Sequence, residues 1–514
     1  MAAVNPIREA LTSGRFCYMV ELVASRLTRE AKLMQVATDL AQIPGLVAGG
    51  ITSYAGGAMG HDPIRVGTAA RARGLTPNIH ITCVDRDRLD ARSVLEDLNA
   101  LGIENVFAIS GDYPKAGRPV STTTPSGYDL DSVQLVELIH EMRAAGLPFY
   151  ISVAVSPFKY TEADCAYQYL KLEKKIAAGA DFAITQLGYD SRKFRELKRY
   201  LDERGLSTPV FGNVYVLGAK AAEKMSKGEP PGCWVAPELV EKIQAETKNA
   251  TDKGLAARLE RAARMVAIVR GLGYAGAYIG GDHSADHISW IIKRSEAVAP
   301  RWEEFAEEIS YGPKDGFFYY DQPKQPPKPR ELKQKIFDIL EPANWPSGVR
   351  TILTGVLRTV DKHPGAAHAL ERAEYAMKSA MFGCQACGNC ILGLMEYTCP
   401  MTCPKNLRNG PCGGTFNGQC EVVPEKPCIW VGVYERAKAA DRIDDLKTFV
   451  PARNRALQGT SSYINYLLER DNRPEHWEPL INITVPASAK PKPAVSQGAA
   501  EKEESLAKTS SGTK

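Results

Sequence analysis

Short apolar runs, each followed by a polar residue or glycine, recur through the first 300 residues and restrict the folds open to this chain. The intervals between the residues that mark their ends are 31, 30, 30, 43, 31, 29 and 66, and these residues are Glu21, Thr52, Thr82, Asp112, Val155, Gln186, Tyr215 and Gly281. A strand with its helix takes about 30 residues, so the spacing predicts eight such units and an insertion near 216–274. Nearly continuous apolar strands alternating with helices are typical of parallel sheets. Eight units in about 250–300 residues favour an α/β protein of the (β/α)8 TIM-barrel class over an open sheet.

The polar residues at the ends of these runs predict where a site would form. In a barrel, the carboxyl ends of all strands meet at one face, where the connecting loops build the active site. Glu21, Thr52, Thr82, Asp112 and Gln186 are therefore expected around one opening, although they are far apart in the sequence. Each of them, taken singly, is also compatible with an ordinary strand-end or helix-capping role.

Eight of the twelve cysteines lie in one short segment and predict a metal site. Their spacing is C-x2-C-x2-C-x8-C-x3-C-x8-C-x7-C-x7-C, and they are Cys384, Cys387, Cys390, Cys399, Cys403, Cys412, Cys420 and Cys428. Three closely spaced thiols, and a proline after Cys399 and after Cys403, are typical of iron–sulfur ligation. Zinc usually takes cysteines in pairs or with histidine, and this segment contains no histidine. We expect one or two [4Fe–4S] clusters, with a mixture of iron–sulfur and zinc, or zinc alone, as alternatives.

Composition and charge exclude several classes of protein. The 64 basic and 60 acidic residues nearly balance, at a net charge of +4, which argues against nucleic acid or a membrane surface as a partner. No stretch approaches the roughly 18 apolar residues that a membrane span needs. The N-terminal residues lack the pattern of a secretory signal. We therefore expect a cytoplasmic protein whose cysteines stay reduced.

Changes in composition along the chain predict its division into parts. The eight strand–helix units give a barrel over residues 1–305, and a segment rich in proline, lysine and aromatic residues gives a linker over 306–345. A smaller cysteine-rich, metal-binding domain is expected over 346–470. The segment 487–514 lacks aromatic residues and is expected to be a disordered tail.

Four segments of the barrel region resemble methylenetetrahydrofolate reductase, a flavin-containing (β/α)8 barrel. They are VEL at 20–22, IHITC at 79–83, SGD at 110–112 and AGADFAITQ at 178–186, in matching order over about residues 1–300. The cysteine region is similar to a C-terminal domain of some bacterial reductases, or to a separate partner subunit in acetogenic bacteria, associated with iron–sulfur and zinc. The resemblance implies a flavoprotein oxidoreductase of one-carbon metabolism and methionine biosynthesis, forming 5-methyltetrahydrofolate from 5,10-methylenetetrahydrofolate. We also expect a homo-oligomer, with a redox protein as a further partner.

The resemblance also implies roles for individual residues. Glu21 matches the general acid that protonates N10 of the substrate, which requires a raised pKa of the kind its apolar surroundings favour. Asp112 matches the aspartate whose charge stabilises the resulting 5-iminium cation. Gln186 matches the glutamine that binds the pterin edge, and Met225 matches a folate contact. The positions that match flavin contacts are Thr52, His80, Ser110, Gly111, Asp112, Tyr128, Lys174 and Lys175.

Two departures from the family pattern leave alternatives open. Residues 22–25 read Leu-Val-Ala-Ser where the family has Phe-Phe-Pro-Pro, and Ser110 stands where the family has arginine. Both lie near the flavin or electron-donor side, and they leave FMN open as an alternative to the expected FAD. The electron donor is NAD(P)H or an iron–sulfur partner acting through the cysteine-rich region. A folate-dependent methyltransferase component with a thiolate-bound metal is the alternative function, and a structural or docking role for the cysteine-rich region is a third reading.

Overall fold

The structure is a computed structural model that describes residues 5–25, 28–52, 54–55, 58–84, 86–113, 128–321 and 332–471. Two compact units make up the chain: Met1–Asp338 with Ile391–Ala452, and Ile339–Cys390 with Arg453–Lys514. The division falls within the segment 346–470, which the composition groups as one domain. The expected tail at 487–514 lies outside the described residues.

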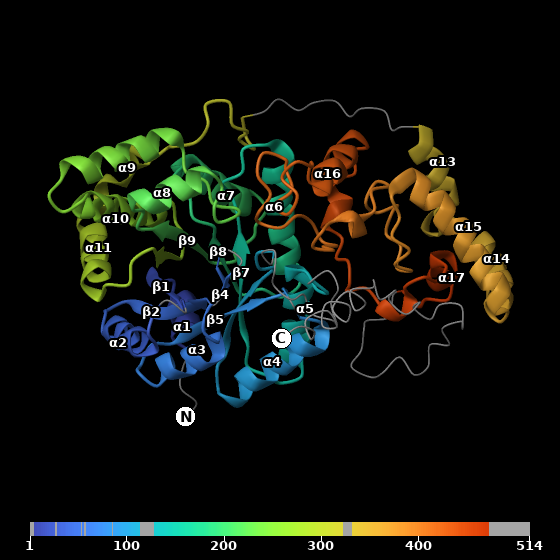
Figure 1. Cartoon of the computed structure of the whole chain (residues 1–514), viewed down its shortest axis with the longest axis horizontal. Coiled ribbons are helices and arrows are strands. Elements are labelled where there is room, and N and C mark those ends of the chain that lie inside the picture. The colour runs from blue at the N-terminus through green and yellow to red at the C-terminus, as the bar shows by residue number, and fades with distance from the viewer. Residues whose placement is uncertain are drawn as a thin grey trace, which may run out of the picture. The chain divides into compact units, whose positions relative to one another are not determined.

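Eight parallel strands close into a barrel, as the repeat of apolar runs predicts (Figure 1). Their order around the barrel is β1-β10-β9-β8-β7-β6-β5-β2. The strands are β1 (Cys17–Val23), β2 (Leu46–Thr52), β5 (Pro77–Thr82), β6 (Asn105–Ile109), β7 (Tyr150–Val155), β8 (Phe182–Thr185), β9 (Val210–Tyr215) and β10 (Gly276–Gly280). Two short strands, β3 (Tyr54–Ala55) and β4 (Ala58–Met59), pair antiparallel after β2. The prediction of a (β/α)8 barrel is confirmed.

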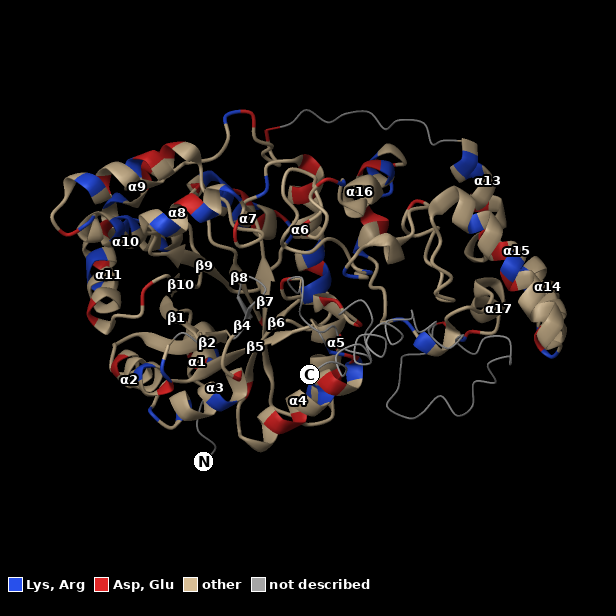
Figure 2. Cartoon of the chain, in the orientation of Figure 1, with Lys and Arg blue, Asp and Glu red and all other residues tan. Residues whose placement is uncertain are grey.

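Helices follow the strands and form the outer layer of the barrel. They are α2 (Glu30–Ala41), α3 (Pro63–Arg71), α4 (Arg88–Ala100), α5 (Ser132–Ala144), α6 (Glu162–Ala177), α7 (Ser191–Glu203), α10 (Leu255–Gly271) and α11 (Ala285–Val298). The insertion forms α8 (Ala219–Ser226) and α9 (Pro237–Asn249), while α1 (Pro6–Thr12) precedes β1 and α12 (Trp302–Glu308) follows α11. Basic and acidic side chains are interspersed on these helices (Figure 2).

Aromatic rings fill the base of the barrel. The ring centroid of Phe182 lies 5.5 Å from that of Tyr150 and 5.5 Å from that of Phe211. A Cβ at Gly276 would come within 2.4 Å of the Phe211 ring, so a glycine on β10 gives this ring its space. The base is therefore a packed core, and open space is left to the opposite end, where the strands finish.

Residues 391–452, which we call the cysteine cap, belong to the same compact unit as the barrel. The cap contains three helical segments, η3 (Pro400–Thr402), α16 (Ile429–Ala439) and η4 (Ile443–Lys447). Helix α16 packs against α6 of the barrel (Figure 1). Trp430 and Tyr167 are both buried there, with ring centroids 5.6 Å apart. The cap is thus an integral part of the barrel's unit.

The second unit is helical. It contains α14 (Ser347–Asp361), α15 (Pro364–Phe382) and α17 (Ser462–Leu467), with η2 (Pro342–Asn344) and η5 (Arg455–Leu457), while α13 (Leu332–Leu340) spans the boundary between the units. Glu374 on α15 forms a buried ion pair with Lys378 at 2.7 Å and accepts a hydrogen bond from the Ser461 hydroxyl at 2.8 Å. Among the described residues, no helix combines the length and the apolar character that crossing a bilayer requires.

Candidate active site at the mouth of the barrel

A cavity of about 370 Å³ opens at the carboxyl ends of the barrel strands, within the size range of small-molecule sites. Both the barrel and the cysteine cap contribute to its wall. The residues expected from the sequence that line it are Glu21, Thr52, His80, Ser110, Gly111, Asp112, Lys175, Gln186, Met225 and Cys412. Tyr128 and Lys174 are outside its lining, as are Thr82 and the other seven cysteines of the 384–428 segment.

Glu21 lies near the carboxyl end of β1, and its half-buried carboxyl group lines the cavity. Its carboxylate lies close to Gly280, where a Cβ would come within 2.9 Å of Oε2, so the absence of a side chain there leaves room for the acid. Burial raises the pKa of Glu21 to about 7. Among the described residues, no cation contributes to this shift. A carboxyl group with a pKa near 7 is about half protonated at neutral pH and can donate its proton to a ligand.

Asp112 and Gln186 reach the same cavity from the ends of β6 and β8. Asp112 follows Gly111, whose φ of +81° belongs to the left-handed region that favours glycine. A Cβ at Gly111 would lie 3.1 Å from a side-chain atom of Thr82, so the loop runs close over β5. The side-chain oxygen of Gln186 accepts a hydrogen bond from the Leu187 N–H at 2.9 Å, which leaves its NH2 group to donate to a ligand.

His80 forms part of the cavity wall as a neutral ring. Burial lowers the pKa of His80 to about 3. The ring meets Phe107 edge to face at 4.7 Å, and Nε2 lies 3.5 Å from the Tyr278 hydroxyl. Thr52 and Met225 are both buried and also line the cavity. A neutral imidazole suits hydrogen bonding to an uncharged ring system better than proton transfer near pH 7.

Tyr128 supports the site from behind instead of lining it. Its hydroxyl donates a hydrogen bond to the Gly111 carbonyl at 3.0 Å, and its ring stacks on that of Tyr113 with centroids 6.3 Å apart. It therefore contacts the loop that carries Asp112.

Three buried lysines lie on α6, of which Lys171 and Lys175 line the cavity and Lys174 does not. Burial lowers the pKa of Lys174 and Lys175 to about 7. Lys175 Nζ donates to the Ala154 carbonyl at 2.6 Å, and Lys171 Nζ donates to the Pro411 carbonyl of the cap at 2.9 Å. Lys174 Nζ is buried and finds no hydrogen-bond partner among the described residues. A buried amine in this state fits an anionic group such as the phosphate of a flavin nucleotide.

Among the further residues at the cavity are five with polar or reactive side chains that the sequence analysis missed or gave another role. Lys171, Lys405 and Glu421 line the cavity, and so does Tyr278, while Cys412 was assigned to a metal site alone. Lys171 belongs to the predicted helix beside Lys174 and Lys175, so the sequence held a signal for it. The run of glycines around Cys412 indicates a close backbone approach, but the strand pattern carries no information that this loop returns to the barrel.

Four cysteines of the cap lie in one electrostatic neighbourhood. Burial raises the pKa of Cys428, and Cys412, Cys403 and Cys420 raise it further. Backbone N–H groups of Leu407 and Lys405 donate to the Cys403 sulfur, as the Trp430 N–H does to that of Cys428. These N–H groups favour the thiolate form, but burial outweighs them and leaves the pKa of Cys403 and Cys428 raised.

No group of three or more His, Cys, Asp or Glu side chains in the described ranges is arranged to hold a single metal ion. A single zinc draws four sulfurs to about 2.3 Å from one centre. The Cys412 thiol donates a hydrogen bond to the Glu421 carboxylate at 3.2 Å.

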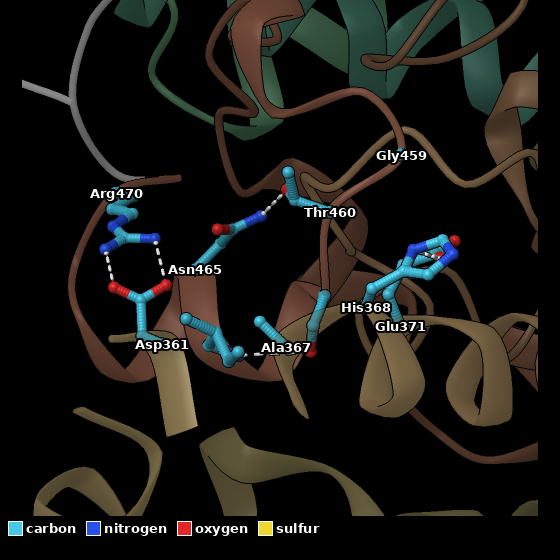
Figure 3. A pocket seen from close by; sticks show the side chains of 10 residues that line it. Asp361, Ala367, His368, Glu371, Gly459, Thr460, Asn465 and Arg470 are labelled. Atoms are coloured by element: carbon cyan, nitrogen blue, oxygen red, sulfur yellow. Dashed lines mark hydrogen bonds and ion pairs between the residues drawn. The ribbon is translucent and has the colours of Figure 1, made fainter. Parts of the chain in front are cut away.

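The second unit contains a small depression of about 10 Å³, drawn in Figure 3. Arg470 and Asp361 form a two-bonded ion pair at one side of it, and His368 and Glu371 lie at the other (Figure 3). Its size admits no organic ligand. Cys384, Cys387 and Cys390 belong to this unit, and the Cys384 sulfur accepts the Ala386 N–H at 3.4 Å.

Comparison with known proteins yields two family matches. The model of the family described as methylenetetrahydrofolate reductase matches residues 6–272, and that described as methylene-tetrahydrofolate reductase C terminal matches residues 363–456. A solved structure titled as an uncharacterized protein from Clostridium thermocellum that binds two copies of 5-methyl-5,6,7,8-tetrahydrofolic acid is similar at a TM-score of 0.40 and 10% identity, over 58% of this chain and 99% of that chain. That likeness is too weak to assign a fold or a ligand.

Curated relatives match parts of the barrel region. The 5,10-methylenetetrahydrofolate reductase of Pectobacterium carotovorum is 32% identical over 29% of this chain and 46% of its own length. That of Salmonella typhimurium is 30% identical over 30% of this chain and 48% of its own. Methylenetetrahydrofolate reductase (NADH) 1 of Zea mays is 25% identical over 42% and 37%. The matches span less than half the length of each of these relatives.

Proposed function

The chain belongs to the methylenetetrahydrofolate reductase family, and from this premise we propose that it reduces 5,10-methylenetetrahydrofolate to 5-methyltetrahydrofolate with a bound flavin. One observation carries the proposal: Glu21, Asp112 and Gln186 line a single cavity, and burial gives Glu21 a pKa of about 7. These are an acid, an anion and a neutral amide, which are the three groups that the reaction needs around the pterin.

The flavin would be held by the cavity wall and by the lysines of α6. Thr52, His80, Ser110 and Gly111 line the cavity and are suited to contact the ring system, while the buried amine of Lys174 suits a phosphate. Tyr128 supports this wall through Gly111. When bound, the flavin supplies the hydride for the methylene carbon. FAD is the proposed form, with FMN as the alternative, and NAD(P)H or an iron–sulfur partner is the proposed electron donor.

The protein's own groups account for the activation of the substrate. Glu21 holds a proton near neutral pH and delivers it to N10, which opens the five-membered ring to the 5-iminium cation. The negative charge of Asp112 stabilises that cation, and this stabilisation grows as positive charge develops in the transition state. Gln186 donates to the pterin edge and fixes its orientation, while Met225 packs against the substrate.

The cysteine cap is the proposed site of a [4Fe–4S] cluster, with Cys403, Cys412, Cys420 and Cys428 as ligands. Their common electrostatic neighbourhood and the backbone N–H groups aimed at two of the sulfurs support this set. Cys384, Cys387, Cys390 and Cys399 stay predicted metal ligands. Such a cluster would supply one-electron transfer, and zinc in place of iron stays the alternative for the region.

Anaerobic purification followed by absorption spectroscopy and by iron, sulfide and zinc analysis tests the cofactors together with turnover. We expect flavin and iron bound to the chain, and 5-methyltetrahydrofolate formed from the methylene substrate with a reduced donor. Glu21→Gln is expected to keep its flavin and lose at least about a hundredfold in kcat. Cys428→Ala is expected to lose iron, whereas Cys165→Ala, a buried barrel cysteine, is the matched control. A protein without flavin that transfers methyl groups would instead identify the methyltransferase component.

A further inference from the structure

An ion pair of the cysteine cap lies against the barrel loop that carries Asp112. Lys405 Nζ is 2.7 Å from both carboxylate oxygens of Glu421, and the two side chains are only 2% and 4% exposed. Both residues line the cavity. A buried pair of this kind is costly to desolvate, so it persists only where further hydrogen bonds complete the coordination of both groups.

Those further hydrogen bonds reach the two neighbours of Asp112. Lys405 Nζ donates to the Gly111 carbonyl at 3.1 Å, and Glu421 Oε1 accepts the Tyr113 N–H at 3.2 Å. With Glu421 bound through both its oxygens, all three N–H groups of the Lys405 ammonium have acceptors. The peptide groups on either side of Asp112 are thereby fixed by side chains that lie about 300 residues away in sequence.

The loop is also restrained from the barrel side. At Gly111 the backbone passes so close to Thr82 and Val84 that an added Cβ would lie 3.1 Å from each side chain. The loop is therefore held between β5 and the Lys405–Glu421 pair. This double restraint limits the directions in which the Asp112 carboxylate can point.

We propose that Lys405 and Glu421 are positioning residues that hold Asp112 toward the substrate, so that the cysteine cap completes the active site of the barrel. The catalytic part rests on the proposed function, whereas the restraint on residues 110–113 does not. A second ion pair between the barrel and the cap differs from the Lys405–Glu421 pair in its exposure and its position. The Glu162–Lys438 ion pair also joins the barrel to the cap, but its side chains are 34% and 28% exposed and neither lines the cavity.

The test compares Lys405→Met/Glu421→Gln with Lys438→Met in the anaerobically purified full chain. The double variant removes the loop contact of Lys405 without leaving an unpaired buried charge, and Lys438→Met removes an ion pair between the same two parts elsewhere. Hydrogen–deuterium exchange of the peptide covering residues 105–113 reports the restraint directly. We expect exchange at residues 110–113 to become faster by about tenfold or more in the double variant and to stay at the wild-type rate in Lys438→Met.

Kinetics then test positioning. We expect kcat of the double variant to fall roughly tenfold to a hundredfold with a smaller change in KM, because the charge of Asp112 matters most in the transition state. Iron content and the melting temperature are measured in the same samples. Unchanged exchange at residues 110–113 overturns the proposal, and so does a loss of iron that accounts for the kinetic loss. If the wild-type chain forms no 5-methyltetrahydrofolate, the proposed function fails, while the exchange experiment still decides the restraint.

Discussion

Glu21 shows how a single half-buried side chain links stability to pH. Its pKa is about 7 in the folded chain against an ordinary value of 4.5. The folded state therefore binds more protons than the unfolded state between these values, so the free energy of unfolding falls as pH rises from 4.5 to 7. The loss is complete above pH 7 and amounts to about 3 kcal/mol at most. Below pH 4.5 the residue is protonated in both states and costs nothing.

The Glu21→Gln variant is expected to remove the free-energy cost of burying the Glu21 charge. Its effect on stability can then be measured independently of its effect on catalysis. Its melting temperature should exceed that of the wild type at pH 8 and match it near pH 4.5, because the amide carries no charge to bury. Thermal unfolding followed by circular dichroism across this pH range measures the difference. A variant that is less stable than the wild type at pH 8 would show that the carboxylate has a stabilising partner.

Lys174 shows the opposite dependence of stability on pH, because burial disfavours the charged form of an amine. Its pKa is lowered from 10.5 to about 7, so its cost is fully present below pH 7 and disappears as pH rises toward 10.5. Without flavin, Lys174→Met is expected to melt higher than the wild type at pH 6.5. With flavin, the lost charge should weaken binding by about tenfold or more, measured by titration of flavin fluorescence. Equal flavin affinity in both proteins would exclude Lys174 from the phosphate site.

At the scale of elements, the contact between α16 and α6 holds the cysteine cap on the barrel. Trp430 is 1% exposed and packs against Tyr167 and Tyr434 within one apolar cluster. Trp430→Ala is expected to lower the free energy of unfolding by about 3–5 kcal/mol, through lost burial and the cavity that remains. Chemical denaturation followed by fluorescence or circular dichroism gives the value.

Trp430→Phe is the matched control for that change. The indole N–H is buried without a hydrogen-bond partner among the described residues, so phenylalanine removes a polar group that is poorly placed while keeping most of the ring. We expect it to cost less than about 1.5 kcal/mol. If the alanine and phenylalanine variants lost the same stability, ring packing would not be what holds α16.

At the scale of the whole molecule, the barrel depends on a segment that follows it by more than fifty residues. The buried Asp131 carboxylate at the start of α5 accepts the N–H groups of Arg408 and Asn409 at 3.1 and 2.9 Å. Buried Lys159 donates to the Gly413 carbonyl of the cap at 2.8 Å, and Lys171 to Pro411. Removing the cap would take these partners away from all three groups, although Asp131 would keep the N–H groups of Val133 and Gln134.

A chain ending at Asp338 is therefore expected to fold poorly, although it contains all eight strands. The expected result is low recovery in the soluble fraction and a weakened near-ultraviolet circular dichroism signal compared with the full chain. A chain shortened only to residue 471, which keeps the cap, is the control and should behave like the full chain. A well-folded protein ending at residue 338 would show that the barrel needs no cap.

The strand pattern determined the barrel and one half of the site. Side chains on parallel strands emerge at a common face, so the polar residues at the ends of the apolar runs bring Glu21, Asp112 and Gln186 to one cavity once the barrel is known. Both the strands and these residues are encoded locally, by alternation of apolar strands and amphipathic helices over about 30 residues.

Only the tertiary structure decided that the cysteine cap forms the other half. Lys405, Cys412 and Glu421 are placed at the cavity by hydrogen bonds and packing between segments about 250 to 300 residues apart in sequence. Such contacts depend on complementary shape and on buried partners supplied by both segments. No periodic pattern in either segment predicts them. The spacing of the cysteines predicted metal binding, but it did not predict that residues 391–452 would pack at the mouth of the barrel.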